Sequence, residues 1–234
     1  MACPAPESIH PALWRASQLA RATGRTVATG YPDLARELPG GGWPTGTLVE
    51  FLIRQPGVGE MRLLRPAIVE VSKRPIALIQ PPHTPQALAL ADWGLPPQQL
   101  LWIRSHRTAD ALWAAEQLLR AGTCGALLFW QQHIRNDALR RLHLAAQSGE
   151  TLFCLMRPLA CARDASPARC RCAAAPAAGG VELTFIKRRG PQQDKPLLVA
   201  LEPSPILLHR HVAPLDLPAP ALPIPRSVPA ELVH

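Results

Sequence analysis

A loop in the first quarter of the sequence has the glycines of a phosphate-binding loop but lacks its lysine and its hydroxyl. In the motif G-x-x-x-x-G-K-[ST], the lysine neutralises the β- and γ-phosphates and the hydroxyl binds magnesium. With Gly59 as the second glycine, Arg54 stands at the first. Glu60 then takes the lysine position and Met61 the hydroxyl position. Because two like charges about 4 Å apart repel by about 1 kcal/mol in water, and more in a partly dry site, Glu60 disfavours nucleotide binding.

This loop, which also contains Pro56 and Gly57, lies between an expected strand and an expected helix. Residues 47–53 form a nearly continuous apolar run, which is typical of a buried strand. Residues 61–73 have a helical pattern. A strand-to-helix turn needs glycine wherever its backbone takes a positive φ, with or without a phosphate.

Strands and helices alternate in the rest of the sequence, which predicts an α/β fold with a mostly parallel sheet and helices on both faces. The expected strands cover residues 74–79, 100–104, 125–130, 152–156, 181–187 and 196–201. The expected helices cover residues 85–93, 108–120 and 136–147. Thr108 is expected to cap its helix, and Gly122 to end it in a left-handed conformation. Residues 160–180, rich in Ala, Pro, Gly and Arg, are expected to be irregular.

The sequence predicts three parts. Residues 1–28 are expected to form an N-terminal arm with a short amphipathic helix at 10–21, residues 29–202 the α/β domain, and residues 203–234 a Pro-rich tail. Prolines at the tail's density favour an extended chain, which is either a plain linker or a segment that docks a partner.

Composition narrows the class of protein. The chain has 234 residues, of which 47% are apolar, so it can bury a core. No apolar run approaches the ~18 residues needed to cross a bilayer, and the N-terminus lacks the pattern of a signal peptide. Six scattered cysteines suit a reducing cytoplasm. The net charge of +8 favours nucleic acid or an acidic protein as a partner.

Two segments before the first long strand resemble the RecA ATPase core. They are Gly41-Gly42-Trp43-Pro44-Thr45-Gly46, similar to its G-G-x-P-x-G element, and Thr29-Gly30-Tyr31-Pro32-Asp33-Leu34, similar to T-G-x-x-x-L. The resemblance extends to about residue 157 and implies a RecA-like sheet with a degenerate phosphate-binding loop.

Within that superfamily the chain more closely resembles the ImuA family of bacterial mutagenesis cassettes. The resemblance rests on residues 38–44, 81–83, 111–117, 138–142 and 187–190. It implies a non-enzymatic adaptor in SOS-induced translesion synthesis, without a cofactor. The implied partners are the polymerase-like protein ImuB, RecA and an error-prone polymerase.

The chain departs from an active RecA-type ATPase at two further positions. The strand that should end in a magnesium-binding aspartate, the Walker B position, ends at Trp130. The segment that should supply the water-activating carboxylate, residues 78–83, has none. Together with Glu60, these departures argue against ATP hydrolysis.

Several alternatives stay open. The related SulA group implies a cell-division inhibitor that binds FtsZ, and a divergent ATPase is a third class. His83 could act as a general base, although no nucleophile lies near it in sequence. Cys161, Cys170 and Cys172 could bind zinc, although their spacing is not the usual one. Trp130 could stack on an adenine or fill the core.

A basic cluster lies between the last two expected strands. Lys187, Arg188 and Arg189 could contact DNA phosphates or an acidic partner, or form a solvated hairpin tip. The sequence therefore places the candidate nucleic-acid contact on this hairpin.

Overall fold

A central sheet of eight strands organises the computed structural model, which describes residues 24–189 and 195–201. The six adjacent strands from β8 to β5 run parallel, and β9 and β10 continue the sheet antiparallel. The order is β10-β9-β8-β3-β7-β6-β4-β5. In that order, the strands cover Leu197–Ala200, Gly180–Lys187, Cys170–Ala177, Thr47–Ile53, Leu152–Pro158, Ala126–Trp130, Ile76–Ile79 and Leu100–Ile103.

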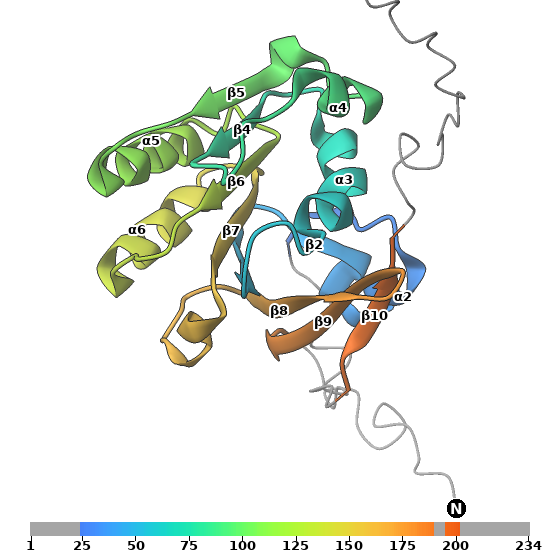
Figure 1. Ribbon diagram of the computed structural model, residues 1–234. Coiled ribbons are helices and arrows are strands. Elements are labelled where there is room, and N and C mark those ends of the chain that lie inside the picture. The colour runs from blue at the N-terminus through green and yellow to red at the C-terminus, as the bar shows by residue number, and fades with distance from the viewer. Residues whose placement is uncertain (1–23, 190–194, 202–234) are drawn as a thin grey trace, which may run out of the picture. The chain divides into compact units, whose positions relative to one another are not determined.

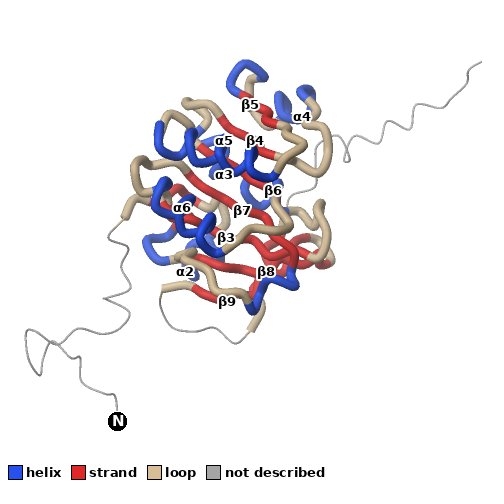
Figure 2. Tube along the Cα trace, turned by 90° about the vertical axis from the view of Figure 1, so that its left-hand side faces the viewer, coloured by secondary structure: helices blue, strands red, loops and turns tan. Residues whose placement is uncertain are grey.

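Helices cover both faces of the sheet (Figures 1 and 2). On one face α5 (Thr108–Ala121) and α6 (Asn136–Ala146) pack on Leu48, Ala77, Leu127 and Phe153. On the other face lie α2 (Pro32–Glu37), α3 (Glu60–Val71) and α4 (Ala87–Asp92). The remaining elements are the two-stranded sheet of β1 (Thr26–Ala28) and β2 (Gly42–Pro44) and the 3-10 helices η2 (Pro39–Gly41), η3 (Pro97–Gln99) and η4 (Leu159–Arg163).

The burial of the central parallel strands explains why they appear as continuous apolar runs in the sequence. Every residue of β3 is buried, because neighbouring side chains point alternately into the two helical layers. The structure confirms the predicted α/β class and the mostly parallel sheet. The strand expected at residues 47–53 coincides with β3. Gly122 ends α5 with φ of 62°, as predicted.

Three local predictions are wrong. Residues 160–180 are not irregular throughout, because β8 pairs with β3 on one side and β9 on the other. Thr108 does not cap α5: it is the first helical residue, Arg107 holds the cap position, and no side chain bonds there. The segment expected to be an arm through residue 28 already joins the fold at β1, where Val27 is buried.

Two other predictions fall on residues 1–23 and 202–234, which lie outside the described residues. They are the N-terminal helix at 10–21 and the extended Pro-rich tail. In the described part of the chain, none of the helices combines the length and apolarity that a bilayer crossing requires.

Candidate functional site

The loop at residues 54–59 leaves the carboxyl end of β3 and leads into α3. In open α/β sheets, ligands bind outside the carboxyl ends of the parallel strands. The loop therefore lies where the fold would present a binding site.

Glu60 closes this loop on itself. It is the first residue of α3, its side chain is buried, and its Oε1 accepts a hydrogen bond from the backbone N–H of Gly57 at 3.0 Å. Backbone amides at a helix N-terminus are suited to bind an anion, and a carboxylate is favoured there. The chain's own carboxylate thus takes up an amide that a bound phosphate would need.

Gly59 fits the tight path of the loop. Its φ is 106°, and a Cβ added there would lie 2.6 Å from Val181 Cγ2 and 3.0 Å from Leu201 Cδ1. Gly57 also has a positive φ, of 86°, but a Cβ there would meet nothing within 4 Å. Val58 between them is buried. The antiparallel end of the sheet therefore packs against the loop and holds its backbone.

The other residues predicted for the loop and the Walker B position differ in burial. Arg54 and Pro56 are exposed, whereas Met61 is half-buried against the core. Trp130 ends β6 as predicted and is largely buried in the core, and its Nε1 has no hydrogen-bond partner among the described residues. These positions put no carboxylate at the end of β6.

Two hollows of about 350 Å³ each flank Trp130. One lies at the ends of β3, β4, β6 and β7 and includes Arg54 and Gln80. The other lies beside Glu60 and is lined mainly by apolar side chains, which are Met61, Leu78, Pro81, Pro82, Pro85, Leu90, Trp93 and Trp130. His83 is exposed at the edge of the second hollow. An apolar lining without lysine suits a hydrophobic group better than a triphosphate.

A buried charge cluster beneath the loop was missed by sequence reasoning. Glu50, fully buried in β3, accepts from Arg157 Nη1 at 2.8 Å and from Arg171 Nε at 2.6 Å. Burial by itself would lower the pKa of Arg157, but the hydrogen bond and charge of Glu50 raise it above its ordinary value. A glutamate inside an otherwise apolar strand was the available signal, since buried charges are normally paired.

The two arginines of this cluster also fix η4. Arg157 Nη2 bonds Asp164 Oδ2 at 3.1 Å, and Arg171 donates to the backbone oxygens of Cys161, Ala162 and Asp164. The cluster therefore joins β3, β7 and β8 to the segment after β7. This is a structural role, because the two arginines hold Glu50 and the segment after β7 together.

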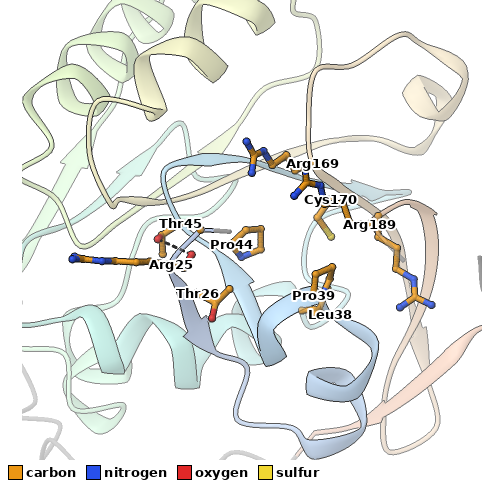
Figure 3. A pocket seen from close by; sticks show the side chains of 11 residues that line it. Arg25, Thr26, Leu38, Pro39, Pro44, Thr45, Arg169, Cys170 and Arg189 are labelled. Carbon is orange, nitrogen blue, oxygen red and sulfur yellow. Dashed lines mark hydrogen bonds between the residues drawn. The ribbon is translucent and has the colours of Figure 1, made fainter. Parts of the chain in front are cut away.

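The three residues of the basic hairpin have different surroundings. Arg188, one of the residues expected to contact DNA or an acidic partner, pairs with Glu37 Oε2 at 2.8 Å and lies over the ring of Phe185. Lys187 is exposed and donates to the backbone oxygen of Ser166 at 3.0 Å. Arg189 is exposed and, with Arg169, flanks a small hollow of about 50 Å³ (Figure 3).

The candidate zinc ligands are not assembled as a site. Cys170 and Cys172 are buried in β8, and Cys161 lies on η4. Among the described residues, no group of three His, Cys, Asp or Glu side chains could hold a metal ion.

Comparison with known proteins identifies partial relatives. No protein-family model matches the sequence. The chain is 32% identical to the "Cell division inhibitor SulA" of Edwardsiella piscicida over 76 residues, which is 32% of this chain and 45% of that protein. It is 29% identical over 119 residues to the proteins of that name from Yersinia pestis (strain Pestoides F) and Yersinia pseudotuberculosis (strain IP 31758), covering 49% of this chain and 70% of each.

This similarity is weak and partial, since the chain spans less than half of the Edwardsiella protein. Of the resemblances noted in the sequence, it supports the one to the SulA group. The names of these relatives place them in cell-division inhibition.

Proposed function

We propose that this chain is a non-enzymatic regulator of the SOS response to DNA damage that acts by binding another protein. The similarity to SulA proteins supports this class of function. The observation that carries the proposal is the bond from Gly57 to Glu60, because it places a buried carboxylate where an ATPase needs a lysine.

On this proposal the chain keeps a RecA-like scaffold and has lost its nucleotide site. The position of the loop at the end of β3 and the order of parallel strands support the scaffold. Trp130 at the end of β6 and the apolar hollow beside Glu60 support the loss. Trp130 offers no carboxylate to bind magnesium at the end of β6.

The partner that we propose first is FtsZ, the tubulin-like division protein, as the resemblance to SulA implies. The test is GTP-dependent assembly of purified FtsZ, followed by light scattering and sedimentation, with increasing amounts of the full chain. We expect assembly to fall as the chain approaches an equal concentration, without any ATP. Unchanged assembly at a molar excess of the chain would contradict this partner.

A second candidate is an ImuA-like adaptor that binds ImuB, together with RecA and an error-prone polymerase. One observation favours it: two segments that carry the ImuA resemblance meet in space. Leu38, Pro39 and Pro44 line the same small hollow as Arg188 and Arg189 (Figure 3). Glu37 beside the first segment also pairs with Arg188 in the second.

A direct comparison separates the two candidates. The tagged full chain is offered FtsZ and ImuB in parallel at the same concentrations and salt. Retention of FtsZ alone supports the division inhibitor, and retention of ImuB alone supports the adaptor. If neither protein is retained, both partner assignments fail.

A further inference from the structure

Four loops at one edge of the sheet carry positive charge and no acidic residue. They connect the carboxyl ends of β3, β4, β5 and β6 to the helices that follow, at residues 54–59, 80–86, 104–107 and 131–135. Their ionisable side chains are Arg54, Arg104, Arg107, Arg135, His83, His106 and His133, and all seven are exposed. No Asp or Glu occurs in these segments.

Among the described residues, none of the four arginines of these loops has an ion-pair partner. In residues 24–189 and 195–201, the ion pairs of the structure involve other arginines. The acidic groups beside these loops are Asp110 and Asp137, in the first turns of α5 and α6, the buried Glu60, and Asp164, which lines one hollow with His133 and Arg135. The loops therefore keep a net positive charge.

Three helices begin at this edge, each with an acidic residue in its first turn. α3, α5 and α6 all begin here, and none of them has a side-chain hydrogen bond at its N-cap. The roughly half positive charge of each helix N-terminus is offset by that acidic residue, so the positive charge of this edge comes from the arginines of the loops. A hollow of about 650 Å³ lies between the starts of α5 and α6, and it is lined by Arg135 and His133 together with Asp137 and Asp164.

The loops form a row along the sheet. From β3 to β5 the sheet order is β3-β7-β6-β4-β5, so Arg54 and Arg104 are separated by four strand spacings. At about 4.8 Å per spacing, the row is roughly 19 Å long. Phosphates in one strand of a duplex are about 3.4 Å apart along the axis, so the row can follow several of them.

We propose that this row of loops binds the phosphate backbone of nucleic acid, through Arg54, Arg104, Arg107 and Arg135. The guanidinium group matches phosphate oxygens in geometry as well as in charge. A protein is the other occupant that the test must exclude, because an apolar hollow is lined in part by two of these loops. The exposed large apolar side chains of the described chain, among them Trp102, Trp113 and Leu144, lie outside these loops.

This surface is separate from the basic hairpin and independent of the proposed partner. The hairpin lies at the opposite edge, since Lys187 pairs with Arg171 near the start of β8. Removing four positive charges at one edge should therefore affect nucleic-acid binding differently from removing four at the other.

The test compares two fourfold variants of the full chain. The carboxyl-edge variant carries Arg54→Ala, Arg104→Ala, Arg107→Ala and Arg135→Ala. The control carries Lys73→Ala, Arg169→Ala, Lys187→Ala and Arg189→Ala, which are exposed cations towards the opposite edge. Fluorescence anisotropy measures binding to a labelled single-stranded oligonucleotide and to its duplex over a series of salt concentrations. Thermal melting checks that each variant is folded.

We expect the carboxyl-edge variant to lose at least about tenfold in affinity at low salt. For each phosphate that the variant no longer neutralises, its log–log salt slope should fall by ~0.7 on the single strand and by ~0.9 on the duplex. The control should keep most of the affinity and slope of the original chain.

Three results would overturn the proposal. They are equal losses in both variants, a loss confined to the control, and an original chain that binds polyglutamate but neither oligonucleotide. The first would show a general effect of net charge, the second binding at the hairpin, and the third an acidic protein as the ligand.

Discussion

The backbone N–H of Gly57 donates a hydrogen bond to Glu60 Oε1 across 3.0 Å. The bond joins the middle of the loop to the first residue of α3, at the helix end where a negative charge is favoured. A bound anion and this carboxylate would compete for the same amide and repel each other. The sequence alone indicated the repulsion, and the structure adds that the carboxylate also holds the loop.

The first prediction concerns nucleotide affinity. We expect the full chain to bind ATP with a Kd above about 1 mM in the presence of magnesium, which corresponds to less than ~4 kcal/mol of binding. Glu60→Lys alone should not produce ATP hydrolysis, because Trp130 leaves the magnesium ion without its carboxylate. Isothermal titration measures the Kd for ATP, and a phosphate-release assay measures hydrolysis by the Glu60→Lys variant. A micromolar, magnesium-dependent Kd would refute the proposed loss of the nucleotide site.

The second prediction separates the two loop glycines. Both have a positive φ, so alanine at either position costs about 1–2 kcal/mol in backbone strain. Gly59→Ala should cost more than Gly57→Ala, because its Cβ would overlap Val181, whereas Gly57 faces open space. The larger Gly59→Val should lower Tm by several degrees. Calorimetric melting of the three variants checks this order, and equal Tm values for the two alanine variants would contradict it.

The third prediction concerns acid stability and His143. Burial lowers the pKa of His143 below its ordinary value, and the charges of Arg169 and Lys187 lower it further. Its Nδ1 faces the N–H of Leu48 at 3.5 Å, which suits a neutral ring. The unfolded chain therefore takes up the proton first as the pH falls.

The neutral His143 ring therefore contributes its full share to the stability of the fold above the unfolded pKa of about 6.5. That share of the stability is lost as the pH falls from there towards the pKa in the folded chain. We expect Tm to drop less between about pH 7.5 and pH 5.5 in His143→Gln than in the original chain. His106→Gln, on an exposed loop, is the matched control and should follow the original chain. An identical pH profile for His143→Gln would exclude this residue as a source of acid sensitivity.

Much of the fold could be predicted because its central strands, β3, β4 and β6, are buried on both faces. A strand such as β3, with every residue buried, leaves a continuous apolar run that identifies it without any other information. Helices α5 and α6 were also recognisable, since their apolar residues recur at helical spacing and pack on a single core.

The strand β8 could not be predicted in this way, because its stability comes from its neighbours. Its residues are mostly Ala and Cys, and it forms because β3 and β9 offer unpaired backbone on both sides. The same applies to the site. The sequence indicated which loop residues were unusual, but Arg188 pairs with Glu37, 151 positions away in the chain. Partners so far apart leave no local pattern.

The last prediction tests the buried cluster around Glu50. Glu50→Gln removes the charge that compensates Arg157 and Arg171, both of which stay buried in the fold. Breaking a buried pair in this way costs about 3–5 kcal/mol, because uncompensated charge remains inside. For a domain of this size each kcal/mol lowers Tm by about 2–4 °C, so we expect a drop of roughly 6–20 °C.

Glu182→Gln is the matched control, since Glu182 is exposed on β9, and its Tm should stay within about 1–2 °C of the original. Hydrogen exchange adds a local measurement. Because Arg171 donates to three backbone oxygens between residues 161 and 164, Arg171→Met should speed the exchange of amides in η4 more than in α5. A Glu50→Gln protein that melts with the original chain would mean that the two arginines find other partners, and that the cluster contributes little to the fold.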